Sequence, residues 1–238
     1  MRLAVVGASG RMGRAVVRLA HAAGVEIVCA VGATDIGRDA GELAGVGAFG
    51  TCVVDGLAAI EHAKADVVID FSAPAATLAL APIAAAAGSA LVSGTTGLGD
   101  DAREAFDRAA ARVPVLWEPN MSLGIHVLSE LVRRASSALA DWDAEIIETH
   151  HRAKVDAPSG TALRLAESTG RARVGMHSLR GGDVIGDHEV HFLGGGERIE
   201  LAHRATNRDV FAYGALRAAR FVAGRAPGRY GLRDVLRT

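Results

Sequence analysis

The stretch Arg2-Leu-Ala-Val-Val-Gly-Ala-Ser-Gly-Arg-Met-Gly13 decides the fold of the first half of this chain. Residues 2–6 are mainly apolar and predict a buried strand that ends at Gly7. A helical pattern then continues to Gly24, and residues 25–31 predict a second strand. The order of strand, glycine turn, helix and strand is the first unit of a dinucleotide-binding fold.

Three glycines in this stretch each have a physical reason to be there. Gly7 permits the sharp turn out of the strand, Gly10 lets the backbone approach a pyrophosphate, and Gly13 lets the helix pack close to the sheet. The unpaired amides at the start of the helix then face the phosphates. The spacing is GxxGxxG, and an ordinary tight strand-to-helix turn is the alternative interpretation. The position of the turn between two strands favours a nucleotide site.

The alternation of strands and helices continues to residue 117. Further strands are predicted at 66–71, 89–93 and 113–117, with helices at 74–87 and 99–112. This alternation indicates a parallel sheet with right-handed crossovers, whose ligand lies beyond the carboxyl ends of the strands. The loops at 71–74 and 94–97 fall there and are rich in small or hydroxylated residues that suit a nicotinamide site. The glycine-rich segment 32–50 predicts a long loop and a candidate flexible flap near the cofactor.

The second half follows a different pattern. A helix is predicted from Ser122 to about Leu139, a strand at 144–149, a helix from about Thr161, strands at 184–193 and 197–204, and a final helix at 209–223. The last two strands alternate polar and apolar residues, which indicates a mixed sheet with one face suited to a subunit interface.

The fold class that we predict is therefore α/β, with two domains. A Rossmann-like dinucleotide-binding domain occupies residues 1–121, and the C-terminal segment 213–238 returns to it. A smaller α+β domain at 122–212, with a mixed open sheet, is expected to bind the substrate and to form the oligomer.

The run Glu148-Thr-His-His-Arg-Ala-Lys-Val-Asp-Ala-Pro-Ser-Gly-Thr-Ala162 carries the chemistry. Of 26 basic residues only Lys64 and Lys154 are lysine, and an ammonium, unlike a guanidinium, can give up a proton. A stray surface lysine is the alternative interpretation of Lys154. The imidazoles of His150 and His151 are suited to binding a carboxylate or moving a proton near neutral pH.

A carboxylate cradle is predicted just after the histidines. Ser159 is a possible helix cap, so that the bare amides of Gly160 and Thr161 point at an anion beside Lys154. Zinc is the competing interpretation of the histidine pair, but the run lacks the separated third and fourth ligands of a closed site. We therefore expect no metal, and a small acidic substrate.

The bulk properties exclude several functional classes. A net charge of −1 argues against a general binder of nucleic acid or membrane surfaces, and no apolar stretch is long enough to span a bilayer. Cys29 and Cys52 lack CxxC spacing and are interpreted as small buried residues in a reducing compartment. The N-terminus has no charged leader, so the expected location is the cytoplasm.

Several motifs together resemble one family. They are Gly7–Gly13, Asp39–Gly45, Asp70–Ser72, Gly94–Gly97 and Glu148–Ala162, with Arg233–Leu236 near the end of the chain. They resemble 4-hydroxy-tetrahydrodipicolinate reductase, also called dihydrodipicolinate reductase, of bacterial diaminopimelate and lysine synthesis. The resemblance covers nearly the whole chain. It implies a homotetramer built through the second domain's sheet, and the reduction of a cyclic imine dicarboxylate by NADH or NADPH with loss of water.

The resemblance also implies a role for each matching residue. His150 would be the proton donor and acceptor and Lys154 the second proton donor, while His151, Ser159, Gly160 and Thr161 would bind the substrate. The dinucleotide would be held by Gly7, Ala8, Ser9, Gly10, Arg11, Met12, Gly94, Thr95, Thr96, Glu118, Pro119, Asn120 and Met121, with Phe71 and Ser72 near the nicotinamide.

Two departures from the family's pattern stand out. The acidic residue expected at the end of the second strand is absent, and that place is occupied by Val31-Gly-Ala-Thr-Asp35. With Arg11, Arg14 or Arg38 nearby, the choice between NADH and NADPH stays open. The segment 168–178 is also shorter than is usual in the family.

Two rival functions also stay open. One is a sibling amino-acid dehydrogenase or aldehyde reductase on the same architecture. The other is a catalytically silent nucleotide-sensing module, against which the intact His150 and Lys154 argue.

Overall fold

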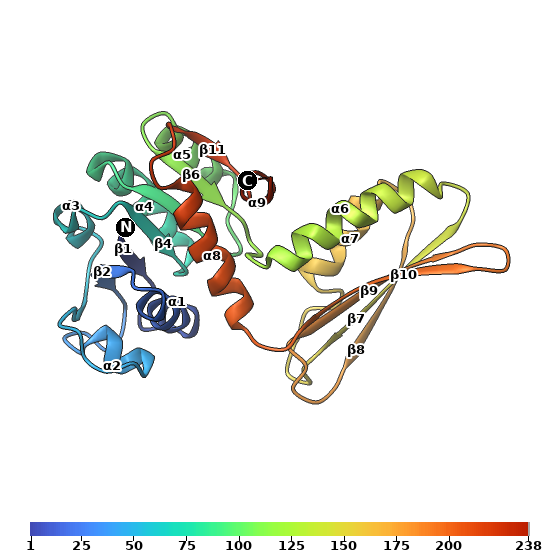
Figure 1. The fold of residues 1–238 in the computed structure, drawn as a ribbon, viewed down its shortest axis with the longest axis horizontal. Coiled ribbons are helices and arrows are strands. Elements are labelled where there is room, and N and C mark those ends of the chain that lie inside the picture. The colour runs from blue at the N-terminus through green and yellow to red at the C-terminus, as the bar shows by residue number, and fades with distance from the viewer. Residues whose placement is uncertain (238) are drawn as a thin grey trace. The chain divides into compact units, whose positions relative to one another are not determined.

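The computed structural model describes residues 1–237, and the chain divides into two compact units. The first unit consists of Met1–Met121 together with the C-terminal segment that begins at Phe211, and the second unit is Ser122–Val210. Each unit has its own sheet and its own core, and Figure 1 shows the elements of both.

A seven-stranded parallel sheet forms the centre of the first unit, with strand order β11-β6-β5-β4-β1-β2-β3. Its strands are β1 (Arg2–Val6), β2 (Glu26–Val31), β3 (Val53–Val54), β4 (Val67–Asp70), β5 (Ala90–Ser93), β6 (Pro114–Trp117) and β11 (Gly228–Tyr230). Its helices are α1 (Arg11–Ala22), α2 (Ala40–Ala44), α3 (Ala59–Ala63), α4 (Pro74–Ala87), α5 (Asp100–Ala110), α8 (Asp209–Val222) and α9 (Leu232–Leu236). The order of β1 to β6 is that of a doubly wound dinucleotide fold, so the predicted α/β class is confirmed.

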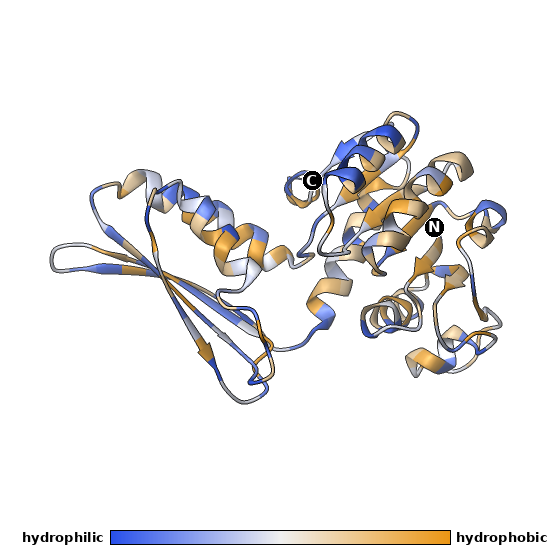
Figure 2. Ribbon diagram, turned by 180° about the vertical axis from the view of Figure 1, so that it is seen from behind, coloured by the Kyte–Doolittle hydropathy of each residue, from blue (hydrophilic) through white to orange (hydrophobic). Residues whose placement is uncertain are grey.

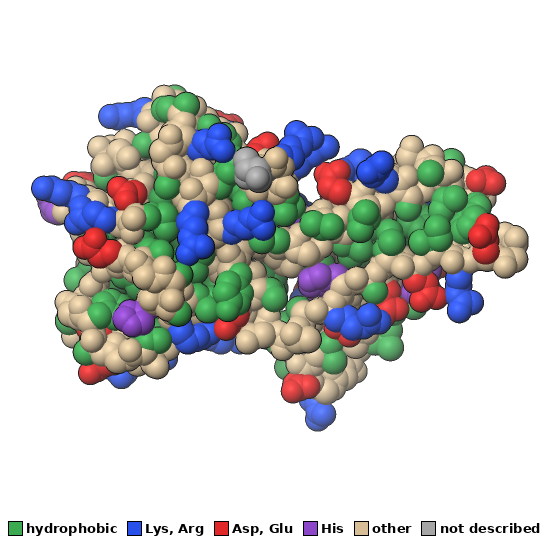
Figure 3. Space-filling view, in the orientation of Figure 1, with side chains coloured by type: hydrophobic (Ala, Val, Ile, Leu, Met, Phe, Trp, Pro, Cys, Tyr) green, Lys and Arg blue, Asp and Glu red, His purple; other side chains and the backbone are tan. Residues whose placement is uncertain are grey.

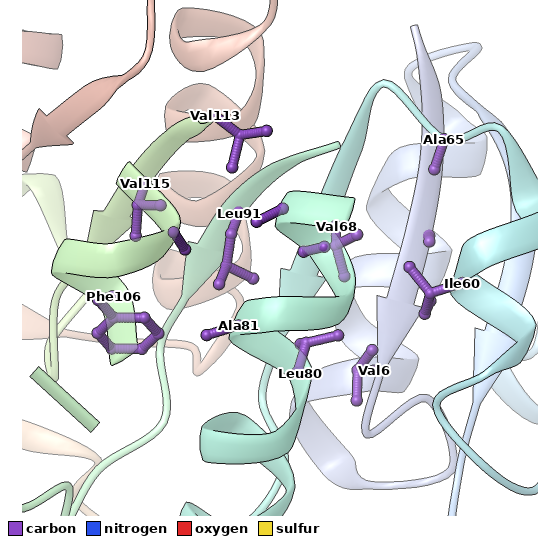
Figure 4. Close-up of a cluster of buried hydrophobic side chains, with 14 of the residues drawn as sticks. Val6, Ile60, Ala65, Val68, Leu80, Ala81, Leu91, Phe106, Val113 and Val115 are labelled. Atoms are coloured by element: carbon purple, nitrogen blue, oxygen red, sulfur yellow. The ribbon is translucent and has the colours of Figure 1, made fainter. Parts of the chain in front are cut away.

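The main core of the first unit lies between this sheet and the helices α3, α4 and α5. Figure 4 shows Val68, Leu91 and Val115 of the strands facing Leu80 of α4 and Phe106 of α5. Because helices cover both faces of a parallel sheet, its strands are apolar almost throughout. Burial of each large apolar side chain stabilises the fold by about 1.5–3 kcal/mol.

The segment 32–50 is not the unbroken long loop that its glycines predict. It contains α2, which begins after Asp39. The Asp39 carboxylate accepts hydrogen bonds from the amides of Gly41 and Glu42 and, across the turn, from those of Phe49 and Gly50. One side chain thus folds the segment onto itself, and the prediction of a long loop without secondary structure is wrong.

Several short elements were not predicted, namely β3, α3, β11 and α9. They contain two to five residues each, too few for a hydrophobic period to be visible. The structure also corrects one of the two cysteines, since Cys29 is buried as expected whereas Cys52 is exposed.

The second unit packs two helices on one face of a mixed four-stranded sheet (Figure 1). Its elements are α6 (Leu123–Ala138), β7 (Asp143–His150), α7 (Gly160–Thr169), β8 (Gly175–Arg180), β9 (Gly186–Leu193) and β10 (Arg198–Ala205). The strand order is β10-β9-β7-β8, with β7 and β8 parallel and the other pairs antiparallel. β8 was not predicted, and it begins within the shortened segment 168–178.

The two faces of this second sheet differ sharply. Ile146 and Val190 point toward the helices and pack against Val132 of α6 and Leu165 of α7. The alternate residues of the strands point away from the helices and are mostly charged, and Figure 2 shows the resulting mixture of polar and apolar residues along each strand. Figure 3 shows a further band of hydrophobic side chains along α6.

Candidate active site

The glycine turn after β1 leaves no room for a side chain at Gly7 or at Gly13. Gly7 has a left-handed φ of +82°, and a Cβ there would lie 2.4 Å from the carbonyl oxygen of Phe71. A Cβ on Gly13 would lie 2.1 Å from the carbonyl oxygen of Gly7. Among the described residues no side chain caps the start of α1 at Gly10, so the first amides of the helix keep the partial positive charge that favours a phosphate.

A cavity of about 390 Å³ opens at this turn, at the carboxyl ends of β1, β2 and β4. Its lining residues are Val6, Gly7, Ser9, Gly10, Val31, Gly32, Ala33, Asp55, Gly56, Leu57, Phe71, Ser72, Ala73 and Ala76. Its size and its few polar groups are typical of a small-molecule site. A tight glycine turn next to a helix start without a side-chain cap fits a dinucleotide pyrophosphate.

The cavity brings together five of the residues predicted to hold the cofactor, namely Gly7, Ser9, Gly10, Phe71 and Ser72. Ala8, Arg11 and Met12 belong to the same turn and first helical turn but do not line the cavity. Asp55, Gly56 and Leu57 are lining residues that the sequence did not reveal, because they follow the unpredicted strand β3.

The buried carboxylate of Asp70 connects the two segments that the sequence predicts to lie near the nicotinamide. It accepts hydrogen bonds from the Ser72 hydroxyl at 2.5 Å and the Thr77 hydroxyl at 2.7 Å on its own side. From the end of β5 and the loop that follows, it accepts bonds from the hydroxyls of Ser93 at 2.8 Å and Thr95 at 3.0 Å. The loops that carry Phe71–Ser72 and Gly94–Thr96 are therefore connected through one side chain.

The Phe71 ring lies directly over the backbone of Gly94, where a Cβ would be 2.1 Å from the ring. Trp117 donates its indole N–H to the Thr95 carbonyl at 2.9 Å, and Thr96 is exposed beside them. The predicted residues of these two loops are thus neighbours in the structure.

The predicted stretch from Glu118 to Met121 continues from β6. The Glu118 amide donates to the Ser93 carbonyl at 3.1 Å, which places the start of the stretch beside the same loop. Pro119 is exposed, Asn120 is half-buried and Met121 is buried. A Cβ on Gly214 of α8 would lie 1.8 Å from the Met121 carbonyl oxygen, so α8 covers the end of the stretch.

In the second unit, His150 is the last residue of β7 and is held by a buried carboxylate. Its Nδ1 lies 2.5 Å from Oε2 of Glu148, a residue that is only 1% exposed. Arg180 donates to both carboxylate oxygens of Glu148, at 2.7 and 2.9 Å, and the Ser159 amide donates to Oε1 at 3.2 Å. The group is buried, paired and fully hydrogen-bonded, as a charge away from water must be.

The pKa values follow from this arrangement. Burial alone raises the pKa of Glu148, but the hydrogen bonds from Arg180 and its other donors outweigh burial and hold the pKa at about 2. Burial lowers the pKa of His150, and Glu148 opposes that shift without cancelling it. His150 is therefore neutral at neutral pH, with its proton on Nδ1 toward Glu148 and a lone pair on Nε2.

The space around His150 is shaped by two further residues that sequence reasoning missed. The His188 ring packs edge-on against the His150 ring at 5.1 Å, and burial lowers the pKa of His188 to about 4. A Cβ on Gly186 would lie 3.0 Å from Nε2 of His150, so a glycine there keeps that atom accessible. His188 was detectable as one polar residue at an inward position of the predicted strand 184–193, but a single such histidine is more often structural.

The remaining predicted residues lie on the loop and helix that follow β7. Lys154 pairs through Nζ with both carboxylate oxygens of Asp156, at 2.6 and 2.7 Å. Nη2 of Arg208 lies 3.4 Å from the His151 ring. Gly160 and Thr161 form the first turn of α7, exposed and half-buried respectively.

Ser159 is the helix cap that the sequence suggested, and its hydroxyl accepts from the Ala162 amide at 3.1 Å. The same hydroxyl lies 3.2 Å from Nε2 of His188 and is buried. Its two partners are thus both inside the protein. Arg180 reaches this loop as well, because its Nη2 donates to the Asp156 carbonyl at 2.7 Å.

Family models cover almost the whole chain. The model described as "Dihydrodipicolinate reductase, N-terminus" matches residues 1–121, and "Dihydrodipicolinate reductase, C-terminus" matches residues 124–236. The chain belongs to the dihydrodipicolinate reductase family. The family resemblance suggested by the sequence motifs is confirmed, and the dinucleotide fold of the first unit is that of an NAD(P)H-dependent oxidoreductase family.

Relatives in the dihydrodipicolinate reductase family match over their full length. A 4-hydroxy-tetrahydrodipicolinate reductase of Stenotrophomonas maltophilia is 50% identical over 242 residues, with 99% of this chain and 98% of that protein covered. The protein of that name from Archaeoglobus fulgidus is 44% identical over 259 residues and is covered completely, as is 99% of this chain. The structure of a dipicolinate-bound dihydrodipicolinate reductase from Paenisporosarcina has the same fold, with a TM-score of 0.81, 24% identity and 97% of each chain covered.

Within residues 1–237, no group of three or more His, Cys, Asp or Glu side chains has an arrangement that would hold a metal ion. No helix in that range combines the length and apolar character needed to cross a membrane.

Proposed function

We propose that the protein catalyses the NADH- or NADPH-dependent reduction of (2S,4S)-4-hydroxy-2,3,4,5-tetrahydrodipicolinate to tetrahydrodipicolinate, with loss of water, in diaminopimelate and lysine synthesis. The observation that carries the proposal is the buried Glu148–His150 pair at the end of β7. Two further findings support the proposal. The first unit has a cavity of the kind that holds a dinucleotide, and the chain is 44–50% identical to reductases of this name.

The first unit is proposed to hold the dinucleotide, which supplies a hydride when bound. The pyrophosphate would lie against Gly7–Met12, where the helix start has no side-chain cap. The nicotinamide would lie by Phe71–Ser72 and Gly94–Thr96, the two loops that Asp70 fixes, and beside Glu118–Met121. This division gives residues 1–121, with the C-terminal segment from about 213, the role of a cofactor domain.

His150 is proposed to accept and donate the proton at Nε2. An ionised Glu148 can only accept hydrogen bonds, so it keeps a proton on Nδ1 of His150 and leaves the lone pair on Nε2 for a reacting group. When Nε2 takes up a proton, the negative charge of Glu148 stabilises the imidazolium. Arg180 keeps Glu148 ionised throughout, because it donates to both oxygens.

Lys154 is proposed to be the second proton donor. Its ammonium is held by Asp156 on a loop that Arg180 also contacts, so its position is constrained although it lies outside regular structure. A substrate carboxylate would be bound by His151 and by the first amides of α7 at Gly160 and Thr161. Because the Ser159 hydroxyl has its partners within the protein, we propose that Ser159 acts on the substrate by positioning these amides.

We further propose a homotetramer and a cytoplasmic location. The outward residues of the mixed sheet include the hydrogen-bonded pair Glu145 and His177 and the ion pair of Glu189 with Arg204. A second copy of this sheet would present polar groups that can pair with them. The residues Val127 and Leu131 add exposed apolar surface on α6. A biosynthetic enzyme that uses NAD(P)H is expected where that cofactor is made and regenerated.

The decisive assay mixes pure protein, NADH or NADPH, and freshly made condensation product of pyruvate and aspartate semialdehyde. We expect nicotinamide absorbance to fall with at least one cofactor. Turnover of aspartate, homoserine or diaminopimelate without imine reduction would instead identify a sibling dehydrogenase. Cofactor binding without turnover of any of these compounds would identify a nucleotide sensor.

A further inference from the structure

Asp35 holds a carboxylate between two arginines just beyond the carboxyl end of β2. Its Oδ2 lies 2.9 Å from Nη2 of Arg14, and its Oδ1 lies 3.1 Å from Nη1 of Arg38. Its backbone is left-handed, with φ of 58°, which is uncommon for a residue with a side chain. Arg14 also donates Nε to the carbonyl of Ser9, a lining residue of the cofactor cavity, at 2.8 Å. The cluster is therefore anchored to the wall of that cavity.

The position that usually carries an acidic residue in such folds is occupied by a glycine. β2 ends at Val31, and the next residue, Gly32, lines the cavity. A Cβ on Gly32 would lie 2.7 Å from the Ser9 hydroxyl oxygen and 2.8 Å from Cγ1 of Val53. An acidic side chain therefore does not fit there without movement of both neighbours. In dinucleotide folds that acid accepts from the ribose hydroxyls of NAD, whereas a nearby arginine accommodates the 2′-phosphate of NADP.

The guanidinium groups of Arg14 and Arg38 are suited to binding a phosphate. Both guanidinium groups already hold one anionic side chain from two sides, and a phosphate offers more charge and more acceptor oxygens than a carboxylate. The side chains of Arg14 and Arg38 are 39% and 58% exposed, so an incoming group can reach them. Asp35 is the group that would have to leave.

We propose that Arg14 and Arg38 form a site for the 2′-phosphate of NADPH, and that Asp35 occupies this site as an internal anion in the free protein. The inference rests on the proposed function as an NAD(P)H-dependent reductase and names its preferred cofactor. NADPH binds by displacing Asp35 from the two arginines. NADH leaves the cluster intact and binds without the phosphate contacts. Asp35 thus reduces the difference in affinity between NADPH and NADH, but NADPH still binds more tightly.

The test is a fluorescence titration of NADPH and NADH against the wild type, Asp35→Asn and Arg38→Gln, with no substrate present. Asparagine tolerates the left-handed backbone, so the first variant removes the charge without straining the turn. We expect the wild type to bind NADPH more tightly than NADH. Asp35→Asn should tighten NADPH binding about fivefold, and Arg38→Gln should weaken it by a similar factor, whereas NADH affinity changes less than about twofold in both.

Arg108→Gln serves as the matched control, because Arg108 also pairs with a carboxylate but lies on the outer surface of α5. It should leave both affinities unchanged. A wild type that prefers NADH, together with an Asp35→Asn variant that loses NADH affinity, would overturn the inference by showing that Asp35 binds the ribose hydroxyls. Equal affinities that no variant changes would overturn the inference alone. Folded protein that binds neither dinucleotide would overturn the proposed function itself.

Discussion

The cofactor cavity of the first unit and the histidine site of the second unit are built in opposite ways. The shape of the cavity depends on glycines, because a Cβ on Gly7, Gly13 or Gly94 would lie 2.4 Å or less from another atom. The histidine site depends on buried charge, since Glu148 collects hydrogen bonds from Arg180, His150 and the Ser159 amide. We therefore expect substitutions that add a side chain at a glycine to disturb the cavity. Substitutions that remove a charge or move a hydrogen-bonding group should disturb the histidine site.

The largest effect is expected for Lys154→Ala, which removes a charge from the histidine site. Turnover should fall by about 10³-fold, because the proposed second proton donor is lost, while NADPH affinity stays within about twofold of the wild type. Steady-state kinetics and a binding titration measure the two quantities. Lys64→Ala is the matched control, since it removes the other lysine of the chain from the end of α3. Equal loss of turnover and cofactor affinity would show that the proton-donor role of Lys154 is wrong.

Glu148→Gln should lower turnover by about 100-fold, because a neutral amide no longer fixes the proton on Nδ1 of His150. Glu148 raises the pKa of His150 against the lowering effect of burial, so its loss should move the acid limb of the pH–rate profile to lower pH. Glu145→Gln is the control, since Glu145 lies on the same strand and pairs with His177 on the opposite face. An acid limb that moves to higher pH would contradict this assignment.

The Glu148→Gln variant also tests how the charge of Glu148 contributes to the free energy of unfolding. The pKa of Glu148 is about 2 in the folded protein, below its ordinary value of 4.5. A carboxyl whose pKa is depressed stabilises the fold above its unfolded pKa, and loses that contribution as the pH falls through the folded pKa. The free energy of unfolding of the wild type should therefore decline between about pH 4.5 and 2 more steeply than that of Glu148→Gln. Urea denaturation at a series of pH values measures this difference.

Gly13→Ala tests the cavity with added volume. The new Cβ would lie 2.1 Å from the Gly7 carbonyl oxygen and push α1 away from the turn. We expect the free energy of unfolding to fall by about 1–3 kcal/mol and NADPH affinity to fall by about tenfold. Denaturant titration and cofactor fluorescence are the measurements. Gly195→Ala, where no atom lies within 4 Å of the added Cβ, should change neither, and a harmless Gly13→Ala would refute the steric account.

Gly186→Ala brings the steric test to the histidine site and should have the smallest effect. A Cβ there would lie 3.0 Å from Nε2 of His150, so the ring must shift by a few tenths of an ångström. Turnover should fall by about fivefold, since proton transfer depends on close positioning, with NADPH affinity unchanged. Steady-state kinetics with the Gly195→Ala control measure it. Unaltered turnover would show that Nε2 of His150 does not face the reacting group.

Long, regular patterns made the first unit predictable from its sequence. The helix expected at 74–87 has those bounds in the structure, because Pro74 starts it and Gly88 ends it in a left-handed conformation. Buried parallel strands such as β4 and β5 are apolar runs between turns, which is a strong signal. The structure of segment 32–50 was not predicted, because it depends on hydrogen bonds to Asp39 that reach as far as eleven residues along the chain. Such bonds produce no periodic pattern of apolar residues in the sequence.

In the second unit, the contacts that depend on the register of the sheet could not be predicted from the sequence. Arg180 meets Glu148 because β8 pairs with β7 so that His150 lies opposite Arg180. The strand β8 contains Gly175, His177 and Ser178, so it shows no clear apolar alternation, and neither the strand nor Arg180 was predicted. The histidine run itself was visible because its residues are close together in the chain.

The Asp70 carboxylate has a consequence for engineering. Its partners come from two segments, Ser72 and Thr77 in the loop after β4 and the start of α4, and Ser93 and Thr95 at the end of β5 and in the loop that follows. A graft that replaces only one of these segments would leave a buried carboxyl group without half of its hydrogen-bond donors. The two segments are therefore exchangeable between homologues as one cassette, transplanted together with the aspartate and not piece by piece.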